Sequence, residues 1–117
     1  MNREELKSAA AQVVSIAEEG QLFTEFVQGG HATPSYAKTH PHYLKLLADS
    51  ASKEIDSAKA GPEIQAAGLD RLKLQMQRLN GAMDKLTNTV NDPSALIKLH
   101  DEFVNIARVA GQIGQSF

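Results

Sequence analysis

The stretch Leu69–Val90 places an apolar residue at alternating steps of three and four residues without a miss. This spacing is typical of a helix that packs along its whole length against other helices. At about 1.5 Å per residue the stretch forms a rod roughly 33 Å long, close to the diameter of a small domain. The positions are Leu69, Leu72, Met76, Leu79, Met83, Leu86 and Val90.

Two further segments repeat this seam, and a fourth carries a thinner, alanine-rich version. The first segment steps through Leu6, Ala9, Val13, Ile16, Gly20, Phe23 and Val27. The last steps through Leu96, Leu99, Phe103, Ile106, Ala110, Ile113 and Phe117. The thin seam is Leu44, Ala48, Ala51, Ile55 and Ala58, with Leu47 beside it. We therefore expect helices at about 3–28, 41–59, 62–90 and 93–115, with a kink or a separate first turn near Gly68 in the third.

The turns between these helices are marked by glycine and proline. Gly29-Gly30 ends the first helix, Gly61-Pro62 separates the second from the third, and Asp92-Pro93 pairs an N-cap with a first-turn proline. The segment 29–40 has no periodicity, so we expect one long loop there, with Pro41 in the first turn of the next helix. Candidate recognition residues in and beside this loop are His31, Tyr36, His40 and His42.

These seams predict an all-α fold, an antiparallel four-helix bundle with up-down-up-down topology. A period nearer 3.5 than 3.6 residues predicts left-handed, coiled-coil-like packing at crossing angles of roughly 20°. The chain of 117 residues is 42% hydrophobic and 22% charged, which fits one domain over 1–117 with a core of its own. Gly20, a seam position without a side chain, indicates either close approach of a neighbouring helix or a kink at that point.

Composition excludes several classes of function. A net charge of −2 argues against nucleic-acid binding, which needs a basic face. The absence of cysteine removes disulfides and thiolate metal sites. No apolar run approaches the ~18 residues of a membrane span. Because Glu4 and Glu5 stand where a signal peptide is basic, we expect a cytoplasmic protein, and export by a route without a cleaved signal stays open.

Nothing in the sequence is typical of an enzyme. There is no Gly-rich phosphate loop, nucleophile elbow, zincin helix or Glu-x-x-His pair of a di-iron bundle. The loop histidines could offer imidazole to zinc or copper, but no fourth ligand accompanies them. We therefore expect no catalytic activity, no metal and no other cofactor. A ligand held inside the bundle is a separate hypothesis, and it predicts a coloured or mass-shifted protein.

The last predicted helix carries a second apolar stripe beside its seam. The stripe is Ile97, His100, Val104, Ala107, Gly111 and Gly114. A helix that buries one side needs only one stripe, so this helix is either central in the bundle or carries an interface. We interpret the chain as a non-enzymatic bundle acting through protein–protein contact or self-association, as an adaptor or as an exported effector or antigen scaffold. The candidate interaction residues are Ile97, His100, Val104 and Ala107.

One tetrapeptide suggests an alternative function. His42-Tyr43-Leu44-Lys45 resembles the His-x-Leu-Lys-Gly motif of histidine phosphotransfer domains, which are also helical bundles of about this length. The resemblance covers four residues, and Leu46 stands where the family has the glycine that leaves room for a receiver domain. It implies that His42 accepts phosphate from a receiver aspartate.

Overall fold

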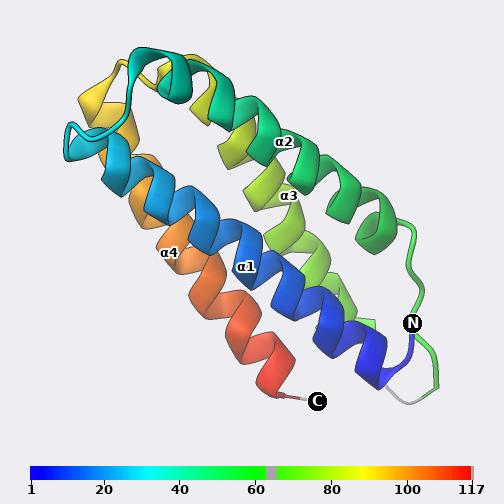
Figure 1. Cartoon of the computed structure of the whole chain (residues 1–117). Helices are drawn as coiled ribbons and strands as arrows, with labels where there is room; N and C mark the ends of the chain where they lie inside the picture. Colours follow the sequence, from blue (N-terminus) through cyan, green and yellow to red (C-terminus); the bar gives the residue numbers. More distant parts are fainter. Residues whose placement is uncertain (63–65, 117) are drawn as a thin grey trace.

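The computed structural model describes residues 1–62 and 66–116, and these residues form four α-helices. The helices are α1 (Arg3–Gln28), α2 (Pro34–Asp56), α3 (Ala66–Thr89) and α4 (Pro93–Gln115). Successive helices run in opposite directions along the bundle, so both chain ends lie at the same end of the molecule (Figure 1). The predicted all-α, up-down-up-down four-helix bundle is confirmed.

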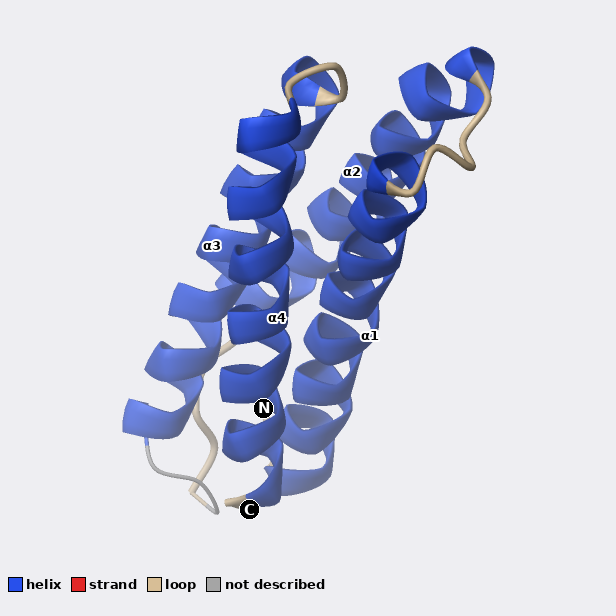
Figure 2. Cartoon of the chain, turned by 90° about the vertical axis from the view of Figure 1, so that its left-hand side faces the viewer, coloured by secondary structure: helices blue, strands red, loops and turns tan. Residues whose placement is uncertain are grey.

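The four helices do not contact one another equally. The most extensive packing joins α1 to α4 and α2 to α3, while α3 also packs on α4 and α1 on α2. Across the centre, α1 reaches α3, whereas α2 and α4 do not approach each other in the described part of the chain. Figure 2 shows α3 and α4 side by side, with α1 on the other side of α4. The line along which α3 and α4 meet therefore faces outward along much of its length.

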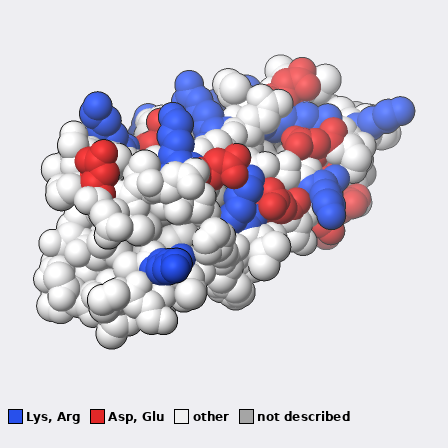
Figure 3. All heavy atoms as spheres, turned by 90° about the horizontal axis from the view of Figure 1, so that it is seen from above, with Lys and Arg blue, Asp and Glu red and all other residues white. Residues whose placement is uncertain are grey.

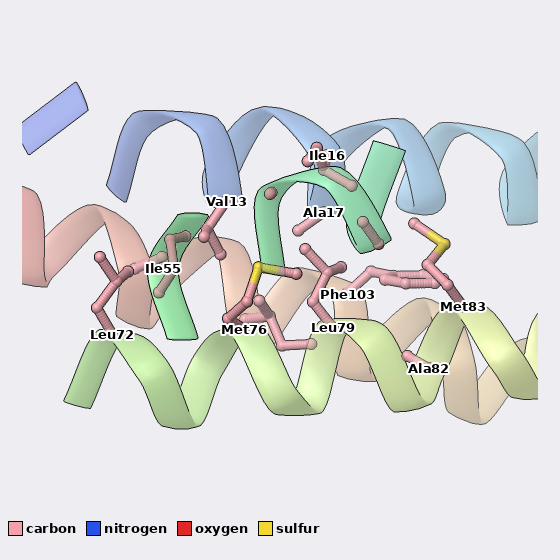
Figure 4. Close-up of a cluster of buried hydrophobic side chains, with 14 of the residues drawn as sticks. Val13, Ile16, Ala17, Ile55, Leu72, Met76, Leu79, Ala82, Met83 and Phe103 are labelled. Atoms are coloured by element: carbon pink, nitrogen blue, oxygen red, sulfur yellow. The ribbon is translucent and has the colours of Figure 1, made fainter. Parts of the chain in front are cut away.

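The predicted seams form the core. On α3 every seam residue from Leu69 to Leu86 is buried, and Val90 is partly buried. The seams of α1, α2 and α4 are buried in the same way over most of their length, while Phe117 lies outside the described residues. Figure 4 shows Met76, Leu79, Met83 and Phe103 turned inward between the helices. The spacing of three and four residues thus identifies the core-facing side of each helix.

The α1–α4 pair is close because small residues line it. At Gly20 an added Cβ would lie 2.8 Å from two atoms of the Phe103 ring, so the ring packs directly on the α1 backbone. At Gly114 an added Cβ would lie 3.3 Å from the Cβ of Ala10. The contact at Gly20 confirms the close approach predicted there, and Gly114 is a second point at which α4 lies close to α1.

Side chains cap the helix starts that the sequence marks. Asn2 and Glu5 form a reciprocal capping box at α1, with hydrogen bonds of 2.8 and 3.2 Å. The Asp92 carboxylate accepts the backbone N–H of Ala95 at 3.2 Å, as predicted for the N-cap of the last helix. At the other end of α1, Gly29 is the C-cap and Gly30 has a positive φ of 74°, which only glycine adopts without strain.

The second helix begins earlier than predicted. We expected a loop over 29–40 and a helix from Pro41, but α2 begins at Pro34. The Thr33 hydroxyl caps the helix by accepting the backbone N–H of Tyr36 at 3.2 Å, and proline suits the first helical position that follows. The predicted long loop is therefore wrong, because Thr33-Pro34 starts a helix as Asp92-Pro93 does.

Pro41 consequently lies inside α2. A proline at this position has no N–H to donate to the carbonyl of Ala37, which costs one helical hydrogen bond. The Pro41 ring is buried, and the burial of its apolar surface offsets part of the cost of the lost hydrogen bond. The connection between α1 and α2 is reduced to residues 29–33.

The second helix also ends earlier than predicted. It stops at Asp56 with Ser57 as C-cap, whereas we expected residue 59 and a cap at Gly61. Gly61 instead donates its N–H to the carbonyl of Met1 at 2.9 Å. The start of the chain thereby holds the segment after α2, and this contact between distant residues leaves no local signal in the sequence.

The third helix agrees with the prediction over most of its length. We expected it from Pro62 to Val90, and the structure describes it from Ala66 to Thr89. Gly68 lies inside its first turn, and the predicted separate turn falls largely on residues 63–65, outside the described residues. The connection between α2 and α3 is therefore longer than the short turn expected at Gly61-Pro62.

Candidate functional site

Aromatic rings from α1, α2 and the turn between them form one contiguous group, which we call the ring cluster. The cluster consists of Phe23, Phe26, His31, Tyr36, His40 and Tyr43. The closest pair is Tyr36 and His40, which stack with centroids 4.6 Å apart and planes 19° from parallel. The other neighbouring centroids lie 5.4–5.7 Å apart, in the range of favourable aromatic pairs.

The ring cluster unites three of the four predicted loop residues. His31 contacts Phe26 from the turn, and Tyr36 and His40 belong to the first turns of α2 rather than to a loop. His42 is exposed and does not belong to the cluster. Within residues 1–62 and 66–116, no three histidine, aspartate or glutamate side chains are placed to hold a metal ion.

Sequence reasoning missed the α1 members of the cluster and Tyr43. Tyr36, His40 and Tyr43 stand at i, i+4 and i+7, the spacing of one helix face. That face is recognisable only when the helix is known to begin at Pro34. The assignment of residues 34–40 to a loop therefore concealed it.

The second stripe of α4 divides into two parts. Ile97 and Val104 are exposed, at 56% and 40% of their surface. His100 and Ala107 are partly buried toward α1, as are the two glycines that follow them. The stripe thus contributes both to the α1–α4 contact and to the surface, and only its outer edge is accessible to a partner.

His100 links α4 to α1 through a carboxylate. Its Nε2 lies 2.8 Å from Oε2 of Glu25, and its Nδ1 lies 3.5 Å from Asp101 on its own helix. The hydrogen bond from His100 lowers the pKa of Glu25, and a second bond from Gln21 lowers it further. The carboxylate of Glu25 is therefore held in its charged form beside His100.

A second polar link joins α2 to α3. The ammonium group of Lys45 forms ion pairs with Asp49 at 3.0 Å and Asp84 at 3.2 Å, and it also donates to the amide oxygen of Asn80. Partial burial acts to lower the pKa of Lys45, but the hydrogen bonds to the two carboxylates outweigh burial and raise it. The ammonium group of Lys45 therefore links α2 to α3 through Asp84 and Asn80.

The segment that runs from the end of α1 through the 29–33 turn into α2 is poor in charge, and exposed apolar side chains lie in and near it. Between residues 26 and 44 the only Lys, Arg, Asp or Glu is Lys38. Figure 3 shows a broad white surface at this end of the molecule, interrupted by a basic side chain. The exposed large apolar side chains in this segment are Phe26, Tyr36 and Tyr43, and Leu22 and Ile97 are exposed near it.

Comparison with protein-family models, with curated proteins and with solved structures found no match to this chain. In the described part of the chain, no helix combines the length and the apolar character that crossing a lipid bilayer requires. Any proposal of function therefore rests on the geometry of the described residues.

Proposed function

We propose that the protein is a non-enzymatic helical-bundle module that acts through protein–protein contact. The observation that carries this proposal is the charge-poor segment 26–44, in which Phe26, Tyr36 and Tyr43 of the ring cluster are exposed, with Leu22 and Ile97 exposed near it. Protein interfaces are enriched in aromatic residues and depleted of charge at their centre. Contiguous apolar surface of this kind on a folded domain is typical of an interaction site.

Within this surface α4 supplies the exposed edge formed by Ile97 and Val104, and His100 and Ala107 support it against α1. The ring cluster supplies aromatic side chains whose edges carry hydrogen-bonding groups, namely the Tyr36 hydroxyl and the His40 imidazole. Such a module fits an adaptor or the scaffold of an exported effector, two roles that share the same physical requirement. Both need a rigid bundle that presents an apolar surface.

A photo-crosslinking amino acid at Ile97 or Val104 is expected to give a discrete crosslinked species in cells that make the protein. The reason is that a bound partner covers this edge. The matched control is Leu74, which is also exposed but lies on α3 in the other half of the bundle, and it should give none. Crosslinked products are resolved by mass. Equal yields at the three positions, or none at Ile97 and Val104, would contradict the proposal.

Light scattering across a concentration series then separates self-association from binding to another protein. Ile97→Glu should remain folded, because Ile97 is more than half exposed. If the wild type forms dimers, this variant should be monomeric under the same conditions. If the wild type is a monomer, Ile97→Glu should instead suppress the crosslinks formed at Val104.

Phosphotransfer through His42 is the second candidate function. One observation favours it: His42 is exposed about two turns into α2, on a helix face rather than at a helix end. Two features oppose it. Lys45 is engaged by Asp49 and Asp84, and Leu46, one turn beyond His42, is 67% exposed where the family has glycine.

The phosphotransfer hypothesis predicts a modified His42 imidazole after incubation with phosphoramidate or a phosphorylated receiver domain. The modification is detected by the mass of the intact protein and by imidazole NMR signals. His42→Ala should abolish it, and His31→Ala, which removes another exposed histidine, should leave it unchanged. An imidazole that stays unmodified under both phosphate donors would exclude this function.

A further inference from the structure

A groove of about 670 Å³ runs along the outward edge between α3 and α4. Arg78 and Lys85 from α3 and Lys98 from α4 line it, and no carboxylate lies within ion-pair distance of these three cations among the described residues. The acid in the groove wall, Glu102, has one carboxylate oxygen buried without a hydrogen-bond partner. The groove therefore carries excess positive charge available to an incoming acidic group.

The centre of this groove is formed by small residues. Gly81 and Ala82 lie between the two cations of α3, and nothing lies within 4 Å of a Cβ built at Gly81. A side chain from outside can therefore approach the α3 backbone at this point. The groove resembles the surface that receives an amphipathic helix, in which apolar anchors enter the middle and charges pair along the rim.

The exposed face of α1 has the complementary pattern, which we call the acidic stripe. It consists of Glu18, Leu22 and Glu25, which share one helix face. Leu22 is 60% exposed, and Glu18 and Glu25 are also exposed. The bonds of Glu25 to His100 and Gln21 both fall on Oε2, which leaves Oε1 for another donor.

The acidic stripe and the groove match in register. Glu18 and Glu25 are separated by seven residues, and so are Arg78 and Lys85. On a helix each pair spans about 10.5 Å, so both acids can face both bases at once. Leu22 then lies opposite Gly81 and Ala82, where the α3 surface leaves room.

We propose that the α3–α4 groove binds the acidic stripe of a second copy of this chain. This inference rests on the proposed function as a protein-binding module, and it names one partner and one surface for it. In a heterologous contact one copy contributes its groove and the other its stripe, so the pair keeps one free stripe and one free groove. Association therefore proceeds head to tail. Ion pairs at its rim weaken when salt shortens the Debye length from about 30 Å at 0.01 M to about 3 Å at 1 M.

Two variants test the inference by complementation. The groove variant Arg78→Glu/Lys85→Glu keeps its stripe, and the stripe variant Glu18→Gln/Leu22→Gln keeps its groove and the Glu25–His100 bond. At low ionic strength the wild type should gain mass steadily with concentration, whereas each variant alone should associate at least tenfold more weakly. An equimolar mixture should form a 1:1 heterodimer and nothing larger, because one intact contact remains. Light scattering and sedimentation velocity measure all four samples, and circular dichroism verifies that the variants are helical.

The control variant Lys7→Glu/Lys38→Glu changes the net charge by the same amount as the groove variant, but at exposed positions outside the groove. It should associate like the wild type. A wild type that remains monomeric at every concentration would overturn this inference and leave the crosslinking test at Ile97 unaffected. Groove and stripe variants that assemble like the wild type while Ile97→Glu does not would also overturn it, and would locate self-association on the edge of α4. Absent crosslinks at Ile97 together with a heterodimer in the mixture would instead reject the proposed surface and retain the groove.

Discussion

Replacing Phe103 with alanine is expected to lower the free energy of unfolding by about 3–5 kcal/mol. Phe103 is fully buried, and its ring fills the space that Gly20 leaves on α1. Removing the ring takes away apolar contacts and leaves a cavity that the rigid helix pair cannot close. Leu79→Ala, also fully buried on the facing helix α3, is expected to cost about 2–5 kcal/mol for the same reason. Denaturant titration followed by circular dichroism measures both values.

The control for these truncations is Ile97→Ala on the same helix as Phe103. Ile97 belongs to the second stripe of α4 and is more than half exposed, so its truncation should change the free energy of unfolding by less than about 0.5 kcal/mol. A loss at Ile97 similar to that at Phe103 would place the whole stripe in the core. It would also remove the basis for assigning Ile97 to an interaction surface.

The parts of the fold predicted from sequence are those that depend on local periodicity. The seam residues of α1 and α3 repeat at three and four residues, and burial follows that repeat along both helices. The bounds of α1 and α4 were predicted because a capping residue or a glycine pair stands at their ends. Where a boundary depends on distant contacts, as at Gly61 with Met1, the sequence offers no local signal.

The start of α2 shows how one signal can be misread. Pro41 resembles a first-turn proline, but Thr33-Pro34 offers the same cap seven residues earlier, and the helix tolerates Pro41 because its ring is buried. This error carried over to the candidate site. His31 and His40 were correctly assigned to one region, yet the ring cluster that unites them needs the face of α2 that the predicted loop removed.

The remaining site features could not be predicted because they join different helices. The bond between His100 and Glu25 spans α4 and α1, and the ion pair of Lys45 with Asp84 spans α2 and α3. Periodicity indicates which face of a helix is buried, but it does not align one helix with another. That alignment follows from packing, and Phe103 on Gly20 is the contact that sets it most directly between α1 and α4.

Gly20→Ala and Gly81→Ala are the same substitution in two helix interiors, and we expect opposite effects on stability. Alanine is favoured over glycine in a helix by about 1 kcal/mol, so Gly81→Ala, where the space is open, should raise the free energy of unfolding by up to that amount. At Gly20 the new Cβ would lie 2.8 Å from the Phe103 ring. Relieving that overlap in a packed core costs about 1–3 kcal/mol. Subtracting the helical gain of about 1 kcal/mol leaves the variant less stable by up to about 2 kcal/mol.

A double-mutant cycle decides whether this loss comes from the Phe103 ring. In a Phe103→Leu background the side chain no longer lies against Gly20 in the same way, so Gly20→Ala should lose most of its cost or become stabilising. Thermal or denaturant unfolding of the two single variants and the double variant gives the coupling energy. An additive cycle would mean that the ring moves aside freely. The close approach of α4 to α1 would then follow from the small residues near Gly114 rather than from the packing of the Phe103 ring on Gly20.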